Sequence, residues 1–223
     1  MKVSILSIGN ELLSGKTMNT NANWLGNRLT KMGCRVEKQI VLPDEEEPII
    51  NALNFLIKDK DSCIIVTGGL GPTDDDITRE VLFNYVETDA KFDLDYWNTL
   101  SKKFKELGIN IPESNRNQAL VPYKGDIIDN PLGSARGFKF KIDNTVIFSL
   151  PGVPSEMKAM TNATIIPWLK DKVKMVLFSQ NIRTTGIPES KLIELISSPI
   201  KGNHNCEVGY YPSIFGVDIR ISS

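Results

Sequence analysis

The stretch from Thr67 to Asp76 has the residue types of a site that binds phosphate together with a metal ion. It reads Thr-Gly-Gly-Leu-Gly-Pro-Thr-Asp-Asp-Asp and directly follows the apolar segment 63–66. Glycines between a strand and a helix let the backbone approach a ligand, and the free N–H groups of a helix N-terminus favour an anion. Three adjacent aspartates would repel that anion unless a divalent cation lies between carboxylate and phosphate. The stretch therefore predicts a metal-dependent nucleotide site.

The same stretch also has a purely structural explanation. Thr73 is a favourable N-cap, and aspartates in a first helical turn are stabilised by the helix dipole with no ligand present. A plain cap, however, needs one acidic residue and no glycine cluster. Because short motifs often match by chance, both interpretations stay open on this stretch alone.

The elements that would position this stretch alternate along the chain. Apolar runs and helical spacings predict strands at 3–8, 35–42 and 63–66 and helices at 19–32 and 44–57. We expect Asp44 and Glu47 to form a capping box for the second helix. The alternation predicts an α/β fold with a parallel sheet and helices on both faces. Glu11 and the glycine-aspartate stretch follow strands, and ligands bind beyond the carboxyl ends of such strands.

The rest of the chain divides into two regions. The first contains predicted helices at 94–107, 115–120 and 156–169, the last capped by Ser155, and a hairpin within 139–150. The second contains strands at 175–184, 208–211 and 217–221 and a helix at 189–196. We expect a domain of residues 1–172 and a small α+β unit of residues 173–223. The last strand ends so close to residue 223 that a short natural chain and a fragment of a longer one both remain open.

Composition excludes several classes of function. The 223 residues are 41% hydrophobic and 24% charged, with a net charge of -1, so no overall charge attracts nucleic acid or an anionic membrane. No run approaches membrane-spanning length, and the cytoplasm is the expected compartment. Cys34, Cys63 and Cys206 lack metal-ligand spacing and are interpreted as packing residues. His204, the single histidine, is expected in an exposed loop.

Five ordered motifs carry a family resemblance over most of the chain. They are residues 9–15 with 19–21, 68–76, 115–119, 130–133 and 151–157. The chain resembles the molybdopterin-binding-like fold of the MogA, MoaB and MoeA proteins, and more closely the N-terminal part of the competence-damage-inducible CinA family. Residues 185–190 and 208–212 resemble the KH-like domain of that family. The resemblance implies a three-layer, mostly parallel sheet with a small KH-like unit at the C-terminal end.

The resemblance also implies an activity. It is metal-dependent hydrolysis of ADP-ribose to AMP and ribose 5-phosphate, with Mg²⁺, Mn²⁺ or Co²⁺ as the cation. The nicotinamide mononucleotide deamidase activity of CinA-like proteins belongs to a further C-terminal domain and is not expected from these residues. Assembly into a dimer or trimer is likewise an expectation by resemblance.

Carried onto this chain, the family pattern assigns roles to acidic residues. Asp76 is the first choice for catalytic metal chemistry, and Asp75 follows it. Glu11 is expected to be a further metal ligand or to orient the attacking water. Asp74 is interpreted as a charge at a helix terminus.

A larger set of residues is expected to bind the substrate. Its members are Ser14, Asn19, Asn21, Gly68, Gly69, Leu70, Gly71, Pro72, Thr73, Gly133, Ser134, Pro151, Gly152 and Glu156. Backbone N–H groups from Gly69 to Thr73 would hold the phosphates, and the side chains of Ser14, Asn19 and Asn21 would bond the ribose or the base. For Asn19 and Asn21 the alternative is capping of the helix that follows. Arg136 replaces an expected proline, as either a phosphate contact or a surface charge.

Two other functions are compatible with the resemblance. The fold would permit molybdopterin binding or adenylylation, but Leu70 and the aspartate triplet fit the CinA-like pattern better. A non-catalytic module that binds nucleotides or nucleic acid is the other alternative. KH recognition of nucleic acid needs a Gly-X-X-Gly loop, and residues 201–205 lack the second glycine. Nucleic acid is therefore a disfavoured partner.

Overall fold

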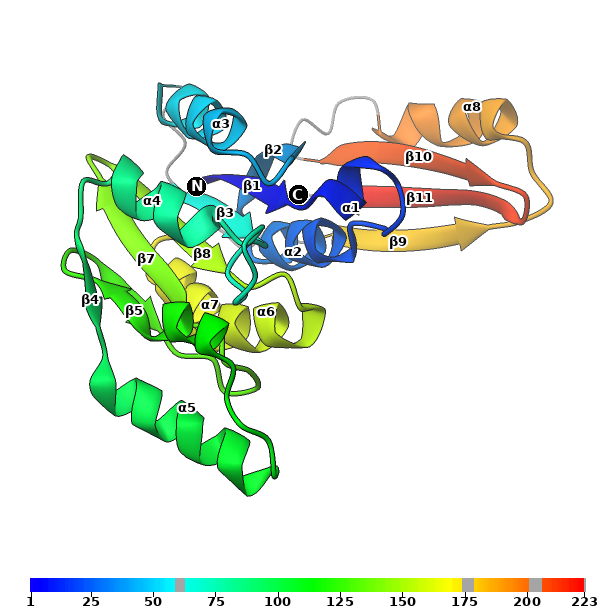
Figure 1. The fold of residues 1–223 in the computed structure, drawn as a ribbon. Coiled ribbons are helices and arrows are strands. Elements are labelled where there is room, and N and C mark those ends of the chain that lie inside the picture. Colours follow the sequence, from blue (N-terminus) through cyan, green and yellow to red (C-terminus); the bar gives the residue numbers. More distant parts are fainter. Residues whose placement is uncertain (59–62, 174–178, 201–205, 223) are drawn as a thin grey trace.

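The larger part of the molecule is built on a six-stranded sheet. The structure is a computed structural model that describes residues 1–58, 63–173, 179–200 and 206–222. The strand order is β2-β1-β3-β8-β7-β6 (Figure 1). The bounds are β1 (Lys2–Ile8), β2 (Arg35–Leu42), β3 (Cys63–Thr67), β6 (Asp126–Ile128), β7 (Gly137–Ile142) and β8 (Thr145–Leu150). The pairs β1–β2, β1–β3 and β3–β8 are parallel, whereas β7 pairs antiparallel with both β8 and β6. The predicted mostly parallel sheet is confirmed.

One face of this sheet is covered by α2 (Thr20–Lys31) and by a long helical segment that follows β8. That segment consists of α6 (Pro154–Met160), a π-helical turn at Thr161–Ile165 and α7 (Ile166–Lys170). Leu25 and Met160 pack with Phe148 in one apolar cluster. Since β8 is buried along its whole length, its side chains pack on both faces.

The opposite face is covered by α3 (Glu46–Lys58) and α4 (Thr78–Tyr85). Leu53 and Leu82 pack there with Ile64 of β3 in a second apolar cluster. Helices on both faces of one sheet produce the predicted three-layer arrangement.

A peripheral segment connects α4 to the far edge of the sheet. It contains α5 (Leu94–Glu106), a 3-10 helix η1 (Glu113–Ala119) and a short ladder of β4 (Ala90–Phe92) with β5 (Leu120–Pro122). The predicted helix at 115–120 is wrong at its end, because Leu120 already belongs to β5. Strands of three residues carry too little alternation to be recognised in a sequence.

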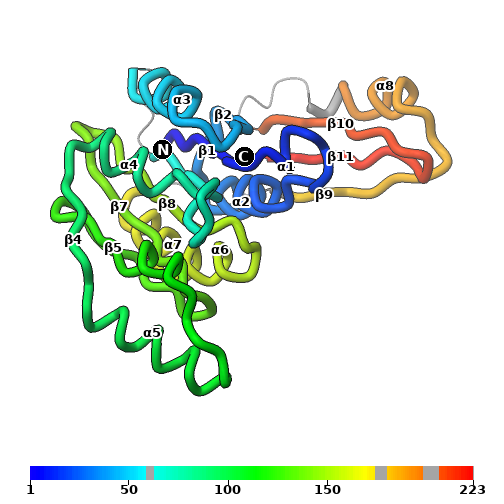
Figure 2. The backbone as a smooth tube through the Cα atoms, viewed as in Figure 1, coloured from blue at the N-terminus to red at the C-terminus, as the bar shows by residue number. Residues whose placement is uncertain are grey.

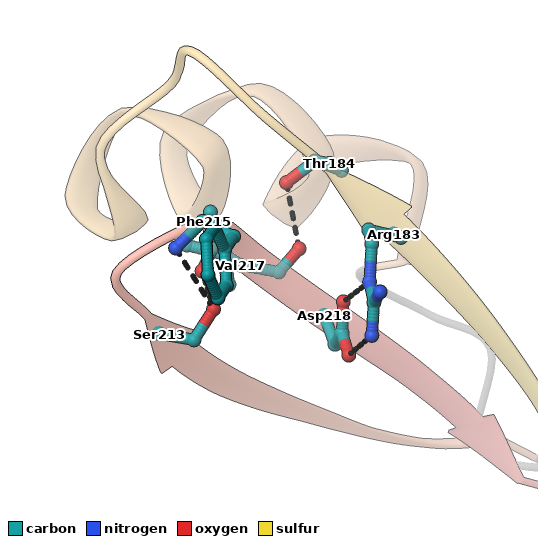
Figure 3. A network of polar contacts seen from close by, with 7 residues as sticks. Arg183, Thr184, Ser213, Phe215, Val217 and Asp218 are labelled. Carbon is teal, nitrogen blue, oxygen red and sulfur yellow. Dashed lines mark hydrogen bonds and ion pairs between the residues drawn. The ribbon is translucent and has the colours of Figure 1, made fainter.

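The C-terminal unit has its own antiparallel sheet, in the order β10-β11-β9, and a helix. Its elements are β9 (Ser179–Thr184), α8 (Glu189–Ile200), β10 (Glu207–Ser213) and β11 (Gly216–Ser222). Leu192 of α8 packs on Val217 and Ile219. Arg183 donates two hydrogen bonds, of 2.9 and 3.1 Å, to Asp218 on the adjacent strand (Figure 3). The turn between β10 and β11 points away from the larger sheet (Figure 2).

This arrangement confirms the strand, helix and two strands predicted for the unit. The first residues of the predicted strand, 175–178, and the loop with His204 lie outside the described residues. Among the residues that the structure describes, no helix combines the length and apolar character required to cross a membrane. Cys34 and Cys63 are buried, which agrees with their interpretation as packing residues.

Two predicted helix starts are wrong. The helix expected from Asp44 begins at Glu46, and the Asp44 carboxylate accepts a bond of 2.9 Å from the Asn10 N–H instead of capping α3. The helix expected after a Ser155 cap begins at Pro154, whose fixed φ suits a first helical position. The first loop also contains a short helix, α1 (Asn10–Leu13), that was not predicted.

Shortening a side chain in the central core should destabilise the fold far more than shortening one at the surface. Phe148 is fully buried and packs edge-on against Trp168, with ring centroids 5.1 Å apart. We expect Phe148→Ala to lower the free energy of unfolding by about 3–5 kcal/mol. Phe55→Ala is the control, because Phe55 is 53% exposed and its loss should cost about 0.5 kcal/mol or less. Urea denaturation followed by tryptophan fluorescence measures both, and equal losses would contradict the assigned core.

Candidate active site

Backbone hydrogen bonds join the carboxyl ends of the parallel strands. The N–H of Gly9, after β1, donates to the carbonyl of Leu42 in β2 at 3.0 Å. The N–H of Gly68, after β3, donates to the carbonyl of Leu150 in β8, also at 3.0 Å. A Cβ on Gly68 would overlap the carbonyl oxygen of Ile8, so only glycine allows β1 and β3 to end this closely together. The loops that follow these strands therefore converge.

The converging loops enclose a cavity of about 380 Å³. The predicted residues that line it are Glu11, Gly68, Gly69, Leu70, Gly71, Pro72, Asp75, Asp76, Ser134, Pro151, Gly152 and Glu156. A groove of about 650 Å³ between α2 and β2 is larger, but Asn19 is the one predicted residue on it. Because convergence of chemical groups is more informative than size, we take the smaller cavity as the candidate site.

The two predicted asparagines lie beside this cavity and not in it. They line an adjoining space of about 110 Å³ that shares Glu11 and Gly152 with the main cavity. Asn19 caps α2, because its side chain accepts a bond of 3.0 Å from the Ala22 N–H. Asn21 donates to the Gly152 carbonyl at 2.7 Å, and its own side-chain oxygen is buried without a partner. Asn21 therefore ties α2 to the Pro151–Gly152 loop and keeps one acceptor free.

Three further predicted residues do not line the main cavity. Ser14 is exposed, and its hydroxyl donates to the Glu11 carbonyl at 3.2 Å. Thr73 is not the cap of α4, which starts at Thr78; its N–H and hydroxyl donate to Asp76 Oδ2 at 3.0 and 2.5 Å. Gly133 lies directly against the side chain of Glu156. The structural explanation of the aspartates as first-turn residues of α4 is thus wrong.

Each of three acidic side chains in the cavity lies over a glycine. A Cβ on Gly9 would be 2.6 Å from both carboxylate oxygens of Glu11. A Cβ on Gly71 would overlap the carboxylate of Asp76, and a Cβ on Gly133 would overlap that of Glu156. The glycines thus make room for carboxylates as well as for backbone turns.

Asp44 is a fifth acidic residue of the cavity, and sequence reasoning missed it. Burial raises the pKa of its carboxyl, the bond from Asn10 lowers it, and the charges of Glu11, Asp75 and Asp76 raise it further. Its position directly after β2, at the same sheet edge as Glu11, is the signal that could have identified it.

The turn of residues 68–71, called the glycine turn below, offers free backbone N–H donors to the cavity. In the described part of the chain, the backbone N–H groups of Gly69, Leu70 and Gly71 have no hydrogen-bond partner. Gly68 and Gly69 have φ angles of 101° and 67°, a conformation that glycine adopts without strain. Consecutive free N–H groups of this kind form a concave anion site.

Two buried arginines lie behind this turn. Arg79 is 5% exposed, and its Nη2 donates to the Leu70 carbonyl at 2.7 Å. Burial lowers the pKa of Arg79 to about 10, against the attraction of Asp76, so Arg79 remains a cation at neutral pH. Arg136 is also 5% exposed; it bonds Asp93 at 2.7 Å and lies over the ring of Tyr96. The interpretation of Arg136 as a surface charge is therefore wrong.

The carboxylates of the cavity do not form a preformed metal cage. Among the described residues, no group of three or more His, Cys, Asp or Glu side chains is arranged to hold a metal ion by protein ligands alone. Glu11, Asp44, Asp75 and Asp76 nevertheless line one cavity, and the charges of the other three raise the pKa of Asp44. Mg²⁺ commonly binds to one or two carboxylates, several waters and substrate phosphates, and this donor set suits it.

Comparison with known proteins identifies the family. Residues 4–171 match a family model described as a probable molybdopterin binding domain, and residues 179–223 match the KH domain of damage-inducible protein CinA. The crystal structure of a CinA protein of unknown function from Thermoplasma acidophilum is 32% identical, with a TM-score of 0.65 over 74% of this chain and 96% of that chain. The chain belongs to the CinA family.

Curated CinA relatives are longer than this chain. The CinA-like protein of Microcystis aeruginosa is 36% identical over 226 residues, which cover 100% of this chain and 54% of the relative. The chain thus spans about half the length of the curated relatives it matches. The molybdopterin biosynthesis enzyme MoaB of Thermus thermophilus has a TM-score of 0.53 at 19% identity, over 78% of this chain and 95% of that chain. This second similarity shows the molybdopterin-binding-like fold alone.

The glycine turn should not tolerate a methyl group at Gly69. Gly69 and Gly108 have similar φ angles of 67° and 72°, but a Cβ on Gly69 would overlap the Thr78 hydroxyl while nothing lies within 4 Å at Gly108. Gly108→Ala should cost about 1–2 kcal/mol, the backbone penalty alone. Gly69→Ala should cost a further 1–3 kcal/mol or so because of the overlap. Chemical denaturation measures both, and equal costs would show that the turn can adjust.

The pH dependence of stability should reveal that ionised Asp44 is unfavourable in the folded protein. Because its folded-state pKa is raised, Asp44 favours folding below its unfolded pKa, and this contribution is lost as pH rises through the folded pKa. Asp44→Asn should therefore raise the melting temperature relative to wild type at about pH 7, but not at about pH 3, where Asp44 is protonated.

Asp93→Asn is the matched control, and its melting temperature should change in the opposite direction. The bond from Arg136 lowers the pKa of Asp93, so ionised Asp93 stabilises the fold at neutral pH and the variant should melt lower there. If Asp44→Asn melts at or below the wild-type temperature at neutral pH, burial and the neighbouring carboxylates do not disfavour ionised Asp44.

Proposed function

We propose that this chain is a metal-dependent hydrolase that cleaves the diphosphate bond of ADP-ribose to give AMP and ribose 5-phosphate. The observation that supports it most is a single cavity with free N–H groups of the glycine turn on one wall and five carboxylates around it. Anion donors beside acidic groups suit a diphosphate that arrives with a cation. The domain division at residue 172 is part of the proposal.

The cation is proposed to be Mg²⁺, Mn²⁺ or Co²⁺, held by Asp76, Asp75 and Glu11 together with substrate phosphates. Asp44 is placed to assist, since it lines the same cavity. When bound, such an ion offsets charge on the diphosphate and lowers the pKa of a coordinated water. Carboxylates and phosphate oxygens are hard ligands, which these ions prefer.

The residues of the chain are proposed to position the reactants. Thr73 fixes one oxygen of Asp76 through its N–H and its hydroxyl, and Asp76 lines the cavity. The free N–H groups of the turn would hold the diphosphate, and Glu11 would accept a bond from the attacking water. The oxygen of this water forms a new P–O bond as the bridging P–O bond breaks, and the released phosphate oxygen takes up a proton in solution.

The ribose is proposed to bind on the opposite wall. Glu156 accepts a bond of 2.6 Å from Asn130, which also accepts from the N–H of Gly133 at 2.9 Å. This network orients the Glu156 carboxylate so that an oxygen can accept from sugar hydroxyls. Cytoplasmic location and assembly into a dimer or trimer belong to the same proposal, and light scattering would test the assembly.

Within the aspartate triplet, activity should depend on Asp76 and not on Asp74. Asp76 lines the cavity, whereas Asp74 lies outside it. We expect Asp76→Asn to lower kcat/KM for ADP-ribose by roughly a hundredfold or more, since several kcal/mol of charge stabilisation depend on the ion. Asp74→Asn should change it by less than about threefold, the scale of a surface charge.

The assay measures AMP release from ADP-ribose with Mg²⁺, Mn²⁺ or Co²⁺. A wild type that is inactive with all three ions would refute the proposed activity. Equal activity of a folded Asp76→Asn variant would refute the role of Asp76. Release of AMP-molybdopterin from molybdopterin and ATP would favour the adenylylation alternative instead.

A further inference from the structure

The carbonyl of Leu70 is held by two buried side chains from separate elements. Arg79 of α4 donates to it through Nη2 at 2.7 Å, and Gln118 of η1 donates through Nε2 at 2.9 Å. The two donors are 5% and 1% exposed, and the Leu70 side chain is itself buried in the core. The carbonyl in the middle of the glycine turn is therefore fixed by donors from two separate elements.

This fixation determines where the next N–H group points. Every peptide bond in the described residues is trans, so the N–H of Gly71 is directed opposite to the Leu70 carbonyl, away from Arg79 and Gln118. Gly71 lines the cavity, and its N–H has no partner among the described residues. The peptide dipole thus presents its positive end on the side of the turn away from the two donors.

A turn of this composition would not hold that orientation by itself. Glycine has access to both signs of φ at little cost, and Leu70 lies between Gly69 and Gly71. Reversal of the Leu70–Gly71 peptide would turn a carbonyl oxygen toward the bound anion and repel it. It would also leave two buried donors without a partner, which costs free energy, more so for the charged one.

Resting on the proposed function, we propose that Arg79 and Gln118 are positioning residues that hold the Leu70–Gly71 peptide with its N–H directed at the substrate phosphate. Neither side chain needs to touch the substrate. Arg79 acts as a cation behind the turn, and Gln118 as the neutral second donor.

The test uses AMP, which binds without being hydrolysed, and follows the backbone amide of Gly71 by NMR. Wild type should show a shift of the Gly71 amide as AMP binds. Gln118→Met keeps the side-chain length but lacks the donor, and should weaken AMP binding about 2–10-fold, the range for one neutral hydrogen bond. Arg79→Met should weaken it roughly 10–100-fold, as expected for a charged donor. Both should reduce the amide shift at saturating AMP and raise KM for ADP-ribose more than they lower kcat.

Arg116→Met is the matched control. It removes an arginine from the same 3-10 helix as Gln118, but Arg116 lies over Phe92 and pairs with Glu113, away from the turn. We expect wild-type AMP affinity and a wild-type Gly71 shift from it. Melting temperatures show whether each variant is folded, and the milder Gln118→Met decides the question should Arg79→Met not fold.

The outcomes separate the two proposals. A Gln118→Met variant with wild-type AMP affinity and a wild-type Gly71 shift would overturn the positioning role, as would a wild type whose Gly71 amide does not respond to AMP. A wild type whose Gly71 amide responds and whose variants weaken AMP binding, but which does not hydrolyse ADP-ribose, would support positioning while refuting the proposed activity.

Discussion

Hydrogen bonds just beyond the ends of the parallel strands are the constraint on which the rest of the site depends. Parallel strands lie about 4.8 Å apart, so loops that continue the ladder at Gly9 and Gly68 begin within the width of a small ligand. The absence of a Cβ at Gly68 permits this closeness. Residues as distant in sequence as Glu11 and Glu156 therefore line one cavity.

The cavity combines charges of opposite sign at different depths. Glu11, Asp44 and the exposed aspartates face solvent at the rim, whereas Arg79 is buried behind the turn. A buried charge is screened less by salt than an exposed one, so the proposed effect of Arg79 on a bound phosphate should depend less on ionic strength than that of the exposed carboxylates. Several carboxylates and a buried arginine that bonds the Leu70 carbonyl are thus compatible in one small site.

The sequence predicted the sheet and most of the cavity because both depend on local patterns. Apolar runs followed by Gly9 and Gly68 identify strand ends, and such ends meet at one edge. The errors arise where one residue type serves two purposes. Asp44 fits a capping box and Thr73 fits an N-cap, and only tertiary contacts decide that Asp44 bonds Asn10 and that Thr73 bonds Asp76. The burial of Arg136 depends on Asp93 and Tyr96, which no local pattern connects to it.

The pairing of three carboxylates with three glycines has a consequence for how such a site can change during evolution. At 9 and 11, at 71 and 76, and at 133 and 156, the glycine leaves the space that the acidic side chain fills. Each acid can keep its present position only while the glycine beside it is retained, and Gly9 is required in addition by its φ angle of 159°. At 71 and 76 and at 133 and 156, a larger residue in place of the glycine would displace the carboxylate, so replacement of a glycine at the edge of the cavity would alter the charge inside it.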